Sequence, residues 1–180
     1  THPGFKLDLP KIHGMMYALL YGDLLMTLVN QCRTYELNKG QAQALADKWV
    51  ARLGDELGSG AKISYKKIKQ NYWKILNDFA DIPVKRYNAV KVGVVREIFV
   101  KYSPLGNNNL EKFLLSEGAE VVCPGLLDFC LYSVYSSISD YKLYGMKRGR
   151  QIAMRTVYNA LHKMQKNLIE TLNQFEMFDT

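Results

Sequence analysis

The residues best suited to chemistry in this chain lie in one polar loop and at two charged positions near it. They are Glu97, Ser103, Asn107, Asn108, Asn109 and Asp128. Carboxylates, a hydroxyl and amides together accept and donate hydrogen bonds. The three histidines are scattered and form no histidine–carboxylate or cysteine–histidine arrangement that would support nucleophilic catalysis. The set therefore suits the positioning of a ligand, and the catalytic residues remain unknown.

The loop from Tyr102 to Asn109 follows a short apolar run and precedes a helical segment. We expect it at the carboxyl end of a strand, the edge of an open α/β sheet where ligands bind. The next helix would offer N–H groups and a positive dipole end to a phosphate or carboxylate. Gly106 would permit an unusual backbone angle. The alternative is a tight turn in which Asn108 or Asn109 only caps the helix.

The charged positions also leave two interpretations open. Arg96 and Glu97 end the expected strand. They either face a cleft, with Glu97 as acid, base or anchor and Arg96 as anion partner, or form an ion pair at the surface. Asp128 follows the second expected strand early in a helix, so it is either a site residue or a carboxylate favoured by the helix dipole.

The cysteines predict neither a disulfide framework nor a metal site. Cys32, Cys123 and Cys130 are an odd number with no short spacing, and their spacing matches no familiar metal or cluster motif. We therefore expect no metal and no cofactor held by this chain. Cysteines without a disulfide pattern are typical of a cytoplasmic protein. The first residues also lack the apolar stretch of a signal peptide.

The elements that must position these residues begin with three helices. Helical spacing of apolar residues predicts them over about 12–33, 39–53 and 64–79, the last with Ser64 as its N-cap. The apolar run of residues 14–29 is too short for a membrane span and contains Asp23, so it indicates a buried helix and no membrane partner.

The sequence pattern changes after residue 88, from helically spaced apolar residues to short apolar runs. Residues 89–95 and 119–124 are short β-branched runs, and residues 109–118 between them are helical and end at Gly118, which predicts a parallel βαβ unit. Helices over 126–139 and 150–175 follow. The fold class is α/β, predominantly helical, with an incomplete flavodoxin-like, doubly wound domain. We divide it into a helical part, 1–83, and the βαβ unit with the C-terminal helices, 84–180.

The composition is that of a globular domain, with 48% hydrophobic and 23% charged residues. The net charge of +7 fits an anionic ligand such as a nucleotide or coenzyme A, an acidic partner protein, or a solvated basic face. No arginine-rich run or RNA-binding aromatic signature is present, so we expect no nucleic-acid partner.

Four stretches together carry a family resemblance. They are LLYGDLL (19–25), YELNKG (35–40), VKYSPLGNNN (100–109) and LLDF (126–129). In this set and order the chain resembles the large proteins related to the activators of 2-hydroxyacyl-CoA dehydratases. The resemblance lies in their segment akin to the subunits of the dehydratase and of benzoyl-CoA reductase.

The resemblance implies a role in anaerobic acyl-CoA metabolism. Such systems use ATP and iron–sulfur clusters to drive electron transfer onto a dehydratase. It also implies that the chain is a fragment of a larger parent, in which ATP and a [4Fe–4S] cluster would be held elsewhere. The fragment would then be non-catalytic alone. Its partners would be the parent's other domains or a dehydratase-type subunit, with acyl-CoA as a possible ligand.

One position departs from the family pattern. Arg96 stands where the family often has a small residue before the glutamate, which would narrow a cleft or add an anion contact.

Two rival functions stay open. In the first, the parent is itself a reductase or dehydratase component, and Glu97 and the asparagine loop line a CoA-thioester or cluster pocket. The second is a flavodoxin-like module whose loop holds a phosphate or a flavin.

Overall fold

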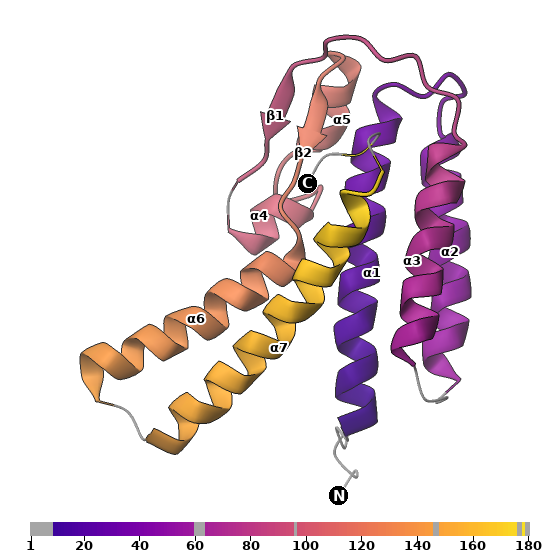
Figure 1. Cartoon of the computed structure of the whole chain (residues 1–180). Coiled ribbons are helices and arrows are strands. Elements are labelled where there is room, and N and C mark those ends of the chain that lie inside the picture. Colours follow the sequence, from indigo (N-terminus) through magenta and orange to yellow (C-terminus); the bar gives the residue numbers. More distant parts are fainter. Residues whose placement is uncertain (1–8, 60–63, 96, 146–147, 176–177, 179–180) are drawn as a thin grey trace, which may run out of the picture. The chain divides into compact units, whose positions relative to one another are not determined.

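The computed structural model describes residues 9–59, 64–95, 97–145, 148–175 and 178. The chain divides into two compact units, Thr1–Cys123 and Pro124–Thr180 (Figure 1). The βαβ unit therefore belongs with the N-terminal helices, whereas the sequence-based boundary at residue 83 placed it with the C-terminal ones. The described chain is mostly helical with one small parallel sheet, as the α/β prediction requires.

Three long helices form most of the first unit. They are α1 (Leu9–Arg33), α2 (Gln41–Gly58) and α3 (Tyr65–Ala80). The predicted cap of α3 is confirmed, since the Ser64 hydroxyl accepts a hydrogen bond from the Lys67 N–H. The prediction ended α2 too early, because a lone glycine at position 54 does not stop a helix whose next residues favour helical backbone.

The core of this unit lies where α1 packs against α2 and α3. Leu20, Leu24 and Leu28 of α1 are fully buried there. The hydrophobic burial of such side chains stabilises the fold by roughly 1.5–3 kcal/mol each. Asn71 of α3 is buried beside them and donates hydrogen bonds to the Tyr21 hydroxyl and the Glu56 carboxylate.

The βαβ unit completes the first unit. It comprises β1 (Lys91–Gly93), α4 (Ile98–Tyr102), α5 (Leu110–Ser116) and β2 (Glu120–Val122). The strands are parallel, with Val92 opposite Val121, which confirms that prediction. Gly118 ends α5 with a φ of 75°, the left-handed conformation that glycine adopts readily. β2 and its helix α5 pack together, and β2 also packs on α1 (Figure 1).

One detail of this unit was predicted wrongly. The polar loop does not follow the first strand directly, because β1 ends at Gly93 and the helix α4 comes between them. The residues of α4 read IFVKY, which is β-branched and aromatic and so resembles a strand in sequence. The Glu97 side chain caps this short helix, which favours its helical conformation.

The second unit is a pair of packed helices, α6 (Leu126–Tyr144) and α7 (Arg148–Leu172). α6 continues past the predicted end at residue 139, so the expected break of residues 141–149 shrinks to a short connection. Elsewhere in the described chain, α1 is the one helix long and apolar enough to cross a membrane by length and composition. The buried core helix of a soluble protein passes the same test.

Candidate functional site

A pocket of about 470 Å³ opens in the first unit beside the carboxyl end of β1. Its lining comes from the segment after β1, from α4, and from the polar loop with the first residue of α5. The lining residues are Gly93, Val94, Val95, Val100, Gly106, Asn107, Asn108 and Leu110. Pockets for small ligands have volumes of roughly 300–1,000 Å³, so this one is large enough for a small molecule.

The lining combines apolar side chains with two amides. Three valines and Leu110 supply apolar surface, and Asn107 and Asn108 supply polar groups. Among the described residues that line the pocket, none carries a charge. The pocket therefore suits an apolar group with one polar atom near the asparagines better than a bare anion.

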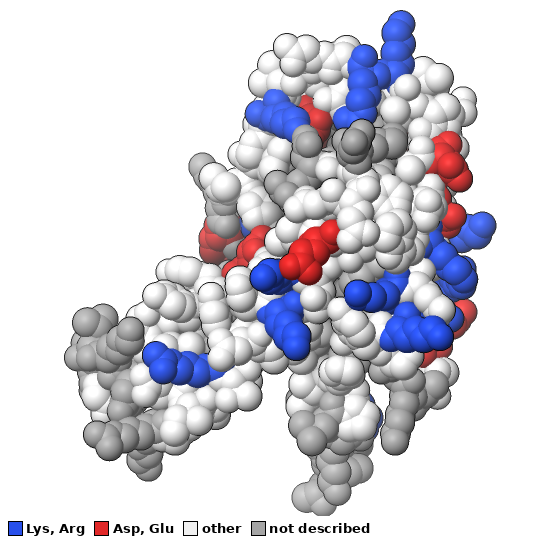
Figure 2. All heavy atoms as spheres, in the orientation of Figure 1, with Lys and Arg blue, Asp and Glu red and all other residues white. Residues whose placement is uncertain are grey.

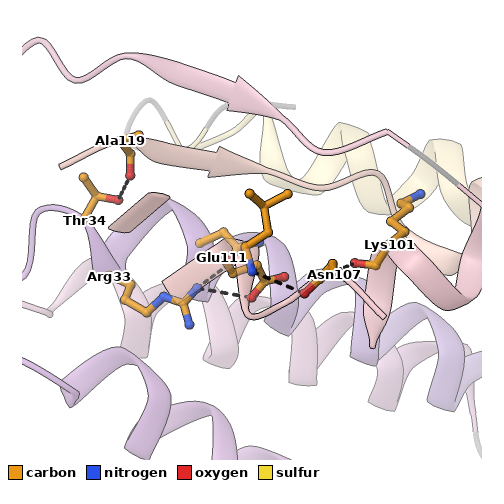
Figure 3. A network of polar contacts seen from close by, with 8 residues as sticks. Arg33, Thr34, Lys101, Asn107, Glu111 and Ala119 are labelled. Atoms are coloured by element: carbon orange, nitrogen blue, oxygen red, sulfur yellow. Dashed lines mark hydrogen bonds and ion pairs between the residues drawn. The ribbon is translucent and has the colours of Figure 1, made fainter. Parts of the chain in front are cut away.

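The loop that forms one wall is held by its own hydrogen bonds. The Ser103 hydroxyl accepts from the Gly106 N–H at 3.3 Å. The Asn107 side chain accepts from the Leu110 N–H at 3.3 Å and donates to the Lys101 carbonyl at 3.5 Å (Figure 3). Under the alternative interpretation, Asn108 or Asn109 would cap the helix. Asn109 does occupy the N-cap position, but without a side-chain hydrogen bond, and the side chain of Asn107 accepts from the helix instead.

Asn108 and Asn109 have a different structural role. Both adopt a φ of 56°, the left-handed region that asparagine tolerates better than most residues. Within the described residues, no hydrogen bond involves the Asn108 side chain, which is exposed and lines the pocket. Asn108 is therefore the loop amide best placed to meet a ligand.

The structure leaves fewer backbone N–H groups of the loop available to an anion than the sequence led us to expect. Within the loop the N–H groups of Asn107, Asn109 and Leu110 donate to backbone carbonyls, and that of Gly106 donates to Ser103. The helix that follows, α5, spans only seven residues. Few oriented N–H groups remain for a phosphate, so the loop acts mainly as a pocket wall.

The Glu97 carboxylate is engaged in hydrogen bonds with the backbone at the start of α4. It accepts hydrogen bonds from the N–H groups of Phe99 at 3.1 Å and Val100 at 3.4 Å. It therefore caps α4 and positions Val100, which lines the pocket. Arg96, the expected anion partner, lies outside the described residues.

The structure gathers five of the six predicted site residues in the first unit and leaves one apart. Glu97, Ser103 and the three asparagines lie at the pocket or support its wall. Asp128 belongs to α6 of the second unit, where its carboxylate accepts a 2.5 Å hydrogen bond from Gln165 of α7. Asp128 therefore has a structural partner and is not counted in the pocket.

Sequence reasoning missed the side chains that fix this site to the helical core. Arg33 at the end of α1 lies 3.4 Å from the Glu111 carboxylate of α5 (Figure 3). The neighbouring Thr34 hydroxyl donates to the Ala119 carbonyl just before β2 at 3.1 Å. These contacts join residues about eighty positions apart, and no local pattern in the sequence signals them.

Lys101 and Cys123 were also not predicted as neighbours. Lys101 is only 8% exposed, and its ammonium lies 4.9 Å from the centre of the Tyr102 ring. Burial raises the pKa of the Cys123 thiol, and the Lys101 ammonium partly offsets that rise. The thiol therefore stays protonated at neutral pH, which is the state of a buried structural cysteine.

The comparisons with known proteins found no relative. No family model matches the chain, and neither a curated protein nor a solved structure matches it. Among the described residues, no group of three or more histidine, cysteine, aspartate or glutamate side chains could hold a metal ion.

Proposed function

We propose that this chain is an acyl-CoA-binding domain, whose pocket beside β1 takes the acyl part of a thioester. The observation that carries the proposal is the apolar pocket of about 470 Å³ with amides in its wall. In this arrangement the acyl chain contacts Val95, Val100 and Leu110. The side chain of Asn108 donates to the thioester carbonyl.

The charge of the chain supports a coenzyme A ligand. The net charge of +7 attracts the phosphates of the coenzyme over long range. None of the described residues that line the pocket is a cation, so in this proposal the phosphates bind outside it and the acyl group carries the specificity. The chain binds and positions the thioester and does no chemistry by itself.

At the level of family, we propose a segment of a protein related to the activators of 2-hydroxyacyl-CoA dehydratases. The support is the set of four sequence stretches, of which VKYSPLGNNN covers the end of α4 and the loop, and contributes Val100, Gly106, Asn107 and Asn108 to the pocket lining. In such a parent, ATP and a [4Fe–4S] cluster would be held by other parts of the protein. The partner would be another domain of the parent or a dehydratase-type subunit in the cytoplasm.

We also propose that β1 and β2 belong to a larger, flavodoxin-like sheet. Two strands of three residues form a marginal sheet by themselves. Val90, which precedes β1, is 72% exposed. Because such apolar strand edges are normally covered, further strands from the parent protein would lie beside β1.

Calorimetry with butyryl-CoA and with free CoA tests the ligand assignment. Each buried methylene contributes about 0.8 kcal/mol, so we expect butyryl-CoA to bind at least about tenfold more tightly than CoA. Val100→Trp fills the pocket and should abolish that preference. The matched control is Val50→Trp, at an exposed valine of α2 remote from the pocket lining, which should leave binding unchanged.

Three results would count against the assignment. They are equal affinity for butyryl-CoA and CoA, no binding of either, and an acyl preference that survives Val100→Trp. A purified protein that carries a yellow flavin would favour the flavodoxin-like alternative instead.

A further inference from the structure

The outer face of α3 carries an unusual mixture of aromatic and basic side chains. We call it the α3 stripe, and it consists of Tyr65, Lys66, Lys69, Gln70, Trp73 and Lys74. These residues line a shallow hollow of about 670 Å³. Figure 2 shows basic side chains gathered over α3 with uncharged surface between them. The stripe is separate from the pocket beside β1 and shares no lining residue with it.

The aromatic side chains of the stripe are exposed although α3 has a complete buried face. Ile68, Tyr72 and Ile75 fill the side of α3 that meets the core. Tyr65 and Trp73, in contrast, are 49% and 41% exposed on the outer side. Large aromatic residues on a surface are characteristic of protein interfaces, where they supply most of the binding energy.

Within the described part of the chain, the charges of the stripe are not neutralised by carboxylates. Lys67, its neighbour on α3, lies 3.1 Å from the Glu56 carboxylate. Among the residues that the structure describes, Lys66, Lys69 and Lys74 have no such carboxylate partner. The Lys69 ammonium instead lies 5.4 Å from the centre of the Tyr65 ring. Three exposed lysines therefore share this hollow with two exposed aromatic side chains.

We propose that the α3 stripe is a docking site for an acidic, amphipathic segment of a partner polypeptide. Glutamate or aspartate side chains of the partner would pair with the three lysines. Apolar side chains of the same segment would pack on Tyr65 and Trp73. Charge complementarity of this kind selects the partner and accelerates its association, while the aromatic contacts supply affinity.

The extent of the stripe favours a peptide over a nucleic acid. It spans Tyr65 to Lys74 of one helix, a rise of about 14 Å at 1.5 Å per residue. Asp78 stands four residues after Lys74 on α3, and Asp81 follows the helix directly. Acidic residues therefore limit the basic surface at its C-terminal end. A nucleic-acid backbone needs a longer run of cations with no acids in its path.

The test uses the whole chain and fluorescence anisotropy. The probe is a labelled synthetic amphipathic peptide of glutamate and leucine, compared with a lysine–leucine peptide and with labelled oligothymidine. We expect the acidic peptide to bind, to lose affinity as salt is added, and to bind about tenfold more weakly to Lys69→Glu and to Trp73→Ala. The matched controls Lys48→Glu on α2 and Leu37→Ala, both at exposed positions, should bind as the unaltered chain does.

The outcomes that would overturn the proposal are equally specific. They are the absence of binding, binding that Lys69→Glu and Lys48→Glu weaken equally, and a preference for the lysine–leucine peptide. Tighter binding of oligothymidine, with loss on Trp73→Ala, would assign the stripe to single-stranded nucleic acid instead. Because both α3 substitutions are at exposed side chains, circular dichroism should confirm unchanged folding.

Discussion

The Tyr35 hydroxyl donates a 2.6 Å hydrogen bond to the Glu120 carboxylate, although the two residues stand 85 positions apart. Both side chains are buried. The other oxygen of Glu120 lies 3.6 Å from the Lys91 ammonium of β1. Burying a carboxylate without partners would cost free energy, and these two contacts offset that cost. The Tyr35–Glu120 hydrogen bond therefore connects the turn after α1 to β2, and the Lys91–Glu120 ion pair connects β2 to β1.

Tyr35→Phe should destabilise the first unit by about 1.5–3 kcal/mol, because it removes a donor from a buried charged acceptor. The measurement is the free energy of unfolding in urea. Tyr65→Phe is the matched control at a half-exposed phenol on α3 and should change stability by less than about 0.5 kcal/mol. Equal effects of the two substitutions would show that the Tyr35–Glu120 bond contributes nothing.

Buried tyrosines should also limit stability at alkaline pH. Burial raises the pKa of Tyr21 and of Tyr35 to about 12, and burial raises that of Tyr72 still further. In the unfolded chain these phenols ionise near pH 10. The folded state therefore holds more protons than the unfolded state above pH 10, and its stability falls as the pH rises through about 12.

Absorbance of phenolate and circular dichroism, followed together against pH, check this expectation. Exposed tyrosines should ionise first with the helices intact, and the buried ones only as helical signal is lost. Ionisation of all twelve tyrosines near pH 10 in a folded chain would contradict it.

Gly106→Ala should destabilise the pocket wall by about 1 kcal/mol or more. A methyl group there would lie 2.9 Å from a ring carbon of Phe99 and 3.0 Å from the Phe99 carbonyl oxygen. Adding Phe99→Ala should recover only part of the loss, because the carbonyl stays in place. Gly54→Ala, in an open part of α2, should instead stabilise by about 0.5–1 kcal/mol. Thermal unfolding that is unchanged by Gly106→Ala would refute the close contact.

Asn107 and Asn108 should differ in their contribution to the free energy of unfolding. Asn107→Ala should cost about 0.5–2 kcal/mol, because its side chain accepts from the Leu110 N–H. Asn108→Gly should change stability by less than about 0.5 kcal/mol, because glycine adopts its φ of 56° freely. Denaturant unfolding of both variants provides the comparison, and a reversed order of effects would be inconsistent with the capping role of Asn107.

Local spacing was enough to predict the helices. In α3, Ile68, Tyr72, Ile75 and Phe79 repeat every three or four residues, and all four are buried. The parallel βαβ unit was predictable for the same reason, since two β-branched runs flank a helix that ends at a glycine. α4 was not, because its five residues resemble a strand in sequence, and the cap that Glu97 provides is not evident from their spacing.

Sequence reasoning pointed to two residues of the pocket lining, but not to its valines or to the contacts that support it. The loop residues drew attention through their types, and Asn107 and Asn108 do line a pocket. Their roles depend on which N–H each side chain meets, and spacing does not determine that. Arg33 and Glu120 went unnoticed because their partners are distant in sequence and come near only when α1 packs on the βαβ unit.

The measurement that tests the central claim most directly is a methyl NMR titration of the valine-labelled chain with butyryl-CoA. The proposed acyl site requires the methyl signals of Val94, Val95 and Val100 to shift and saturate together. Those of Val50 on α2 and Val157 on α7 should stay in place. Saturable binding that leaves the three pocket valines unchanged, or no binding at all, would contradict the assignment of this pocket to an acyl-CoA.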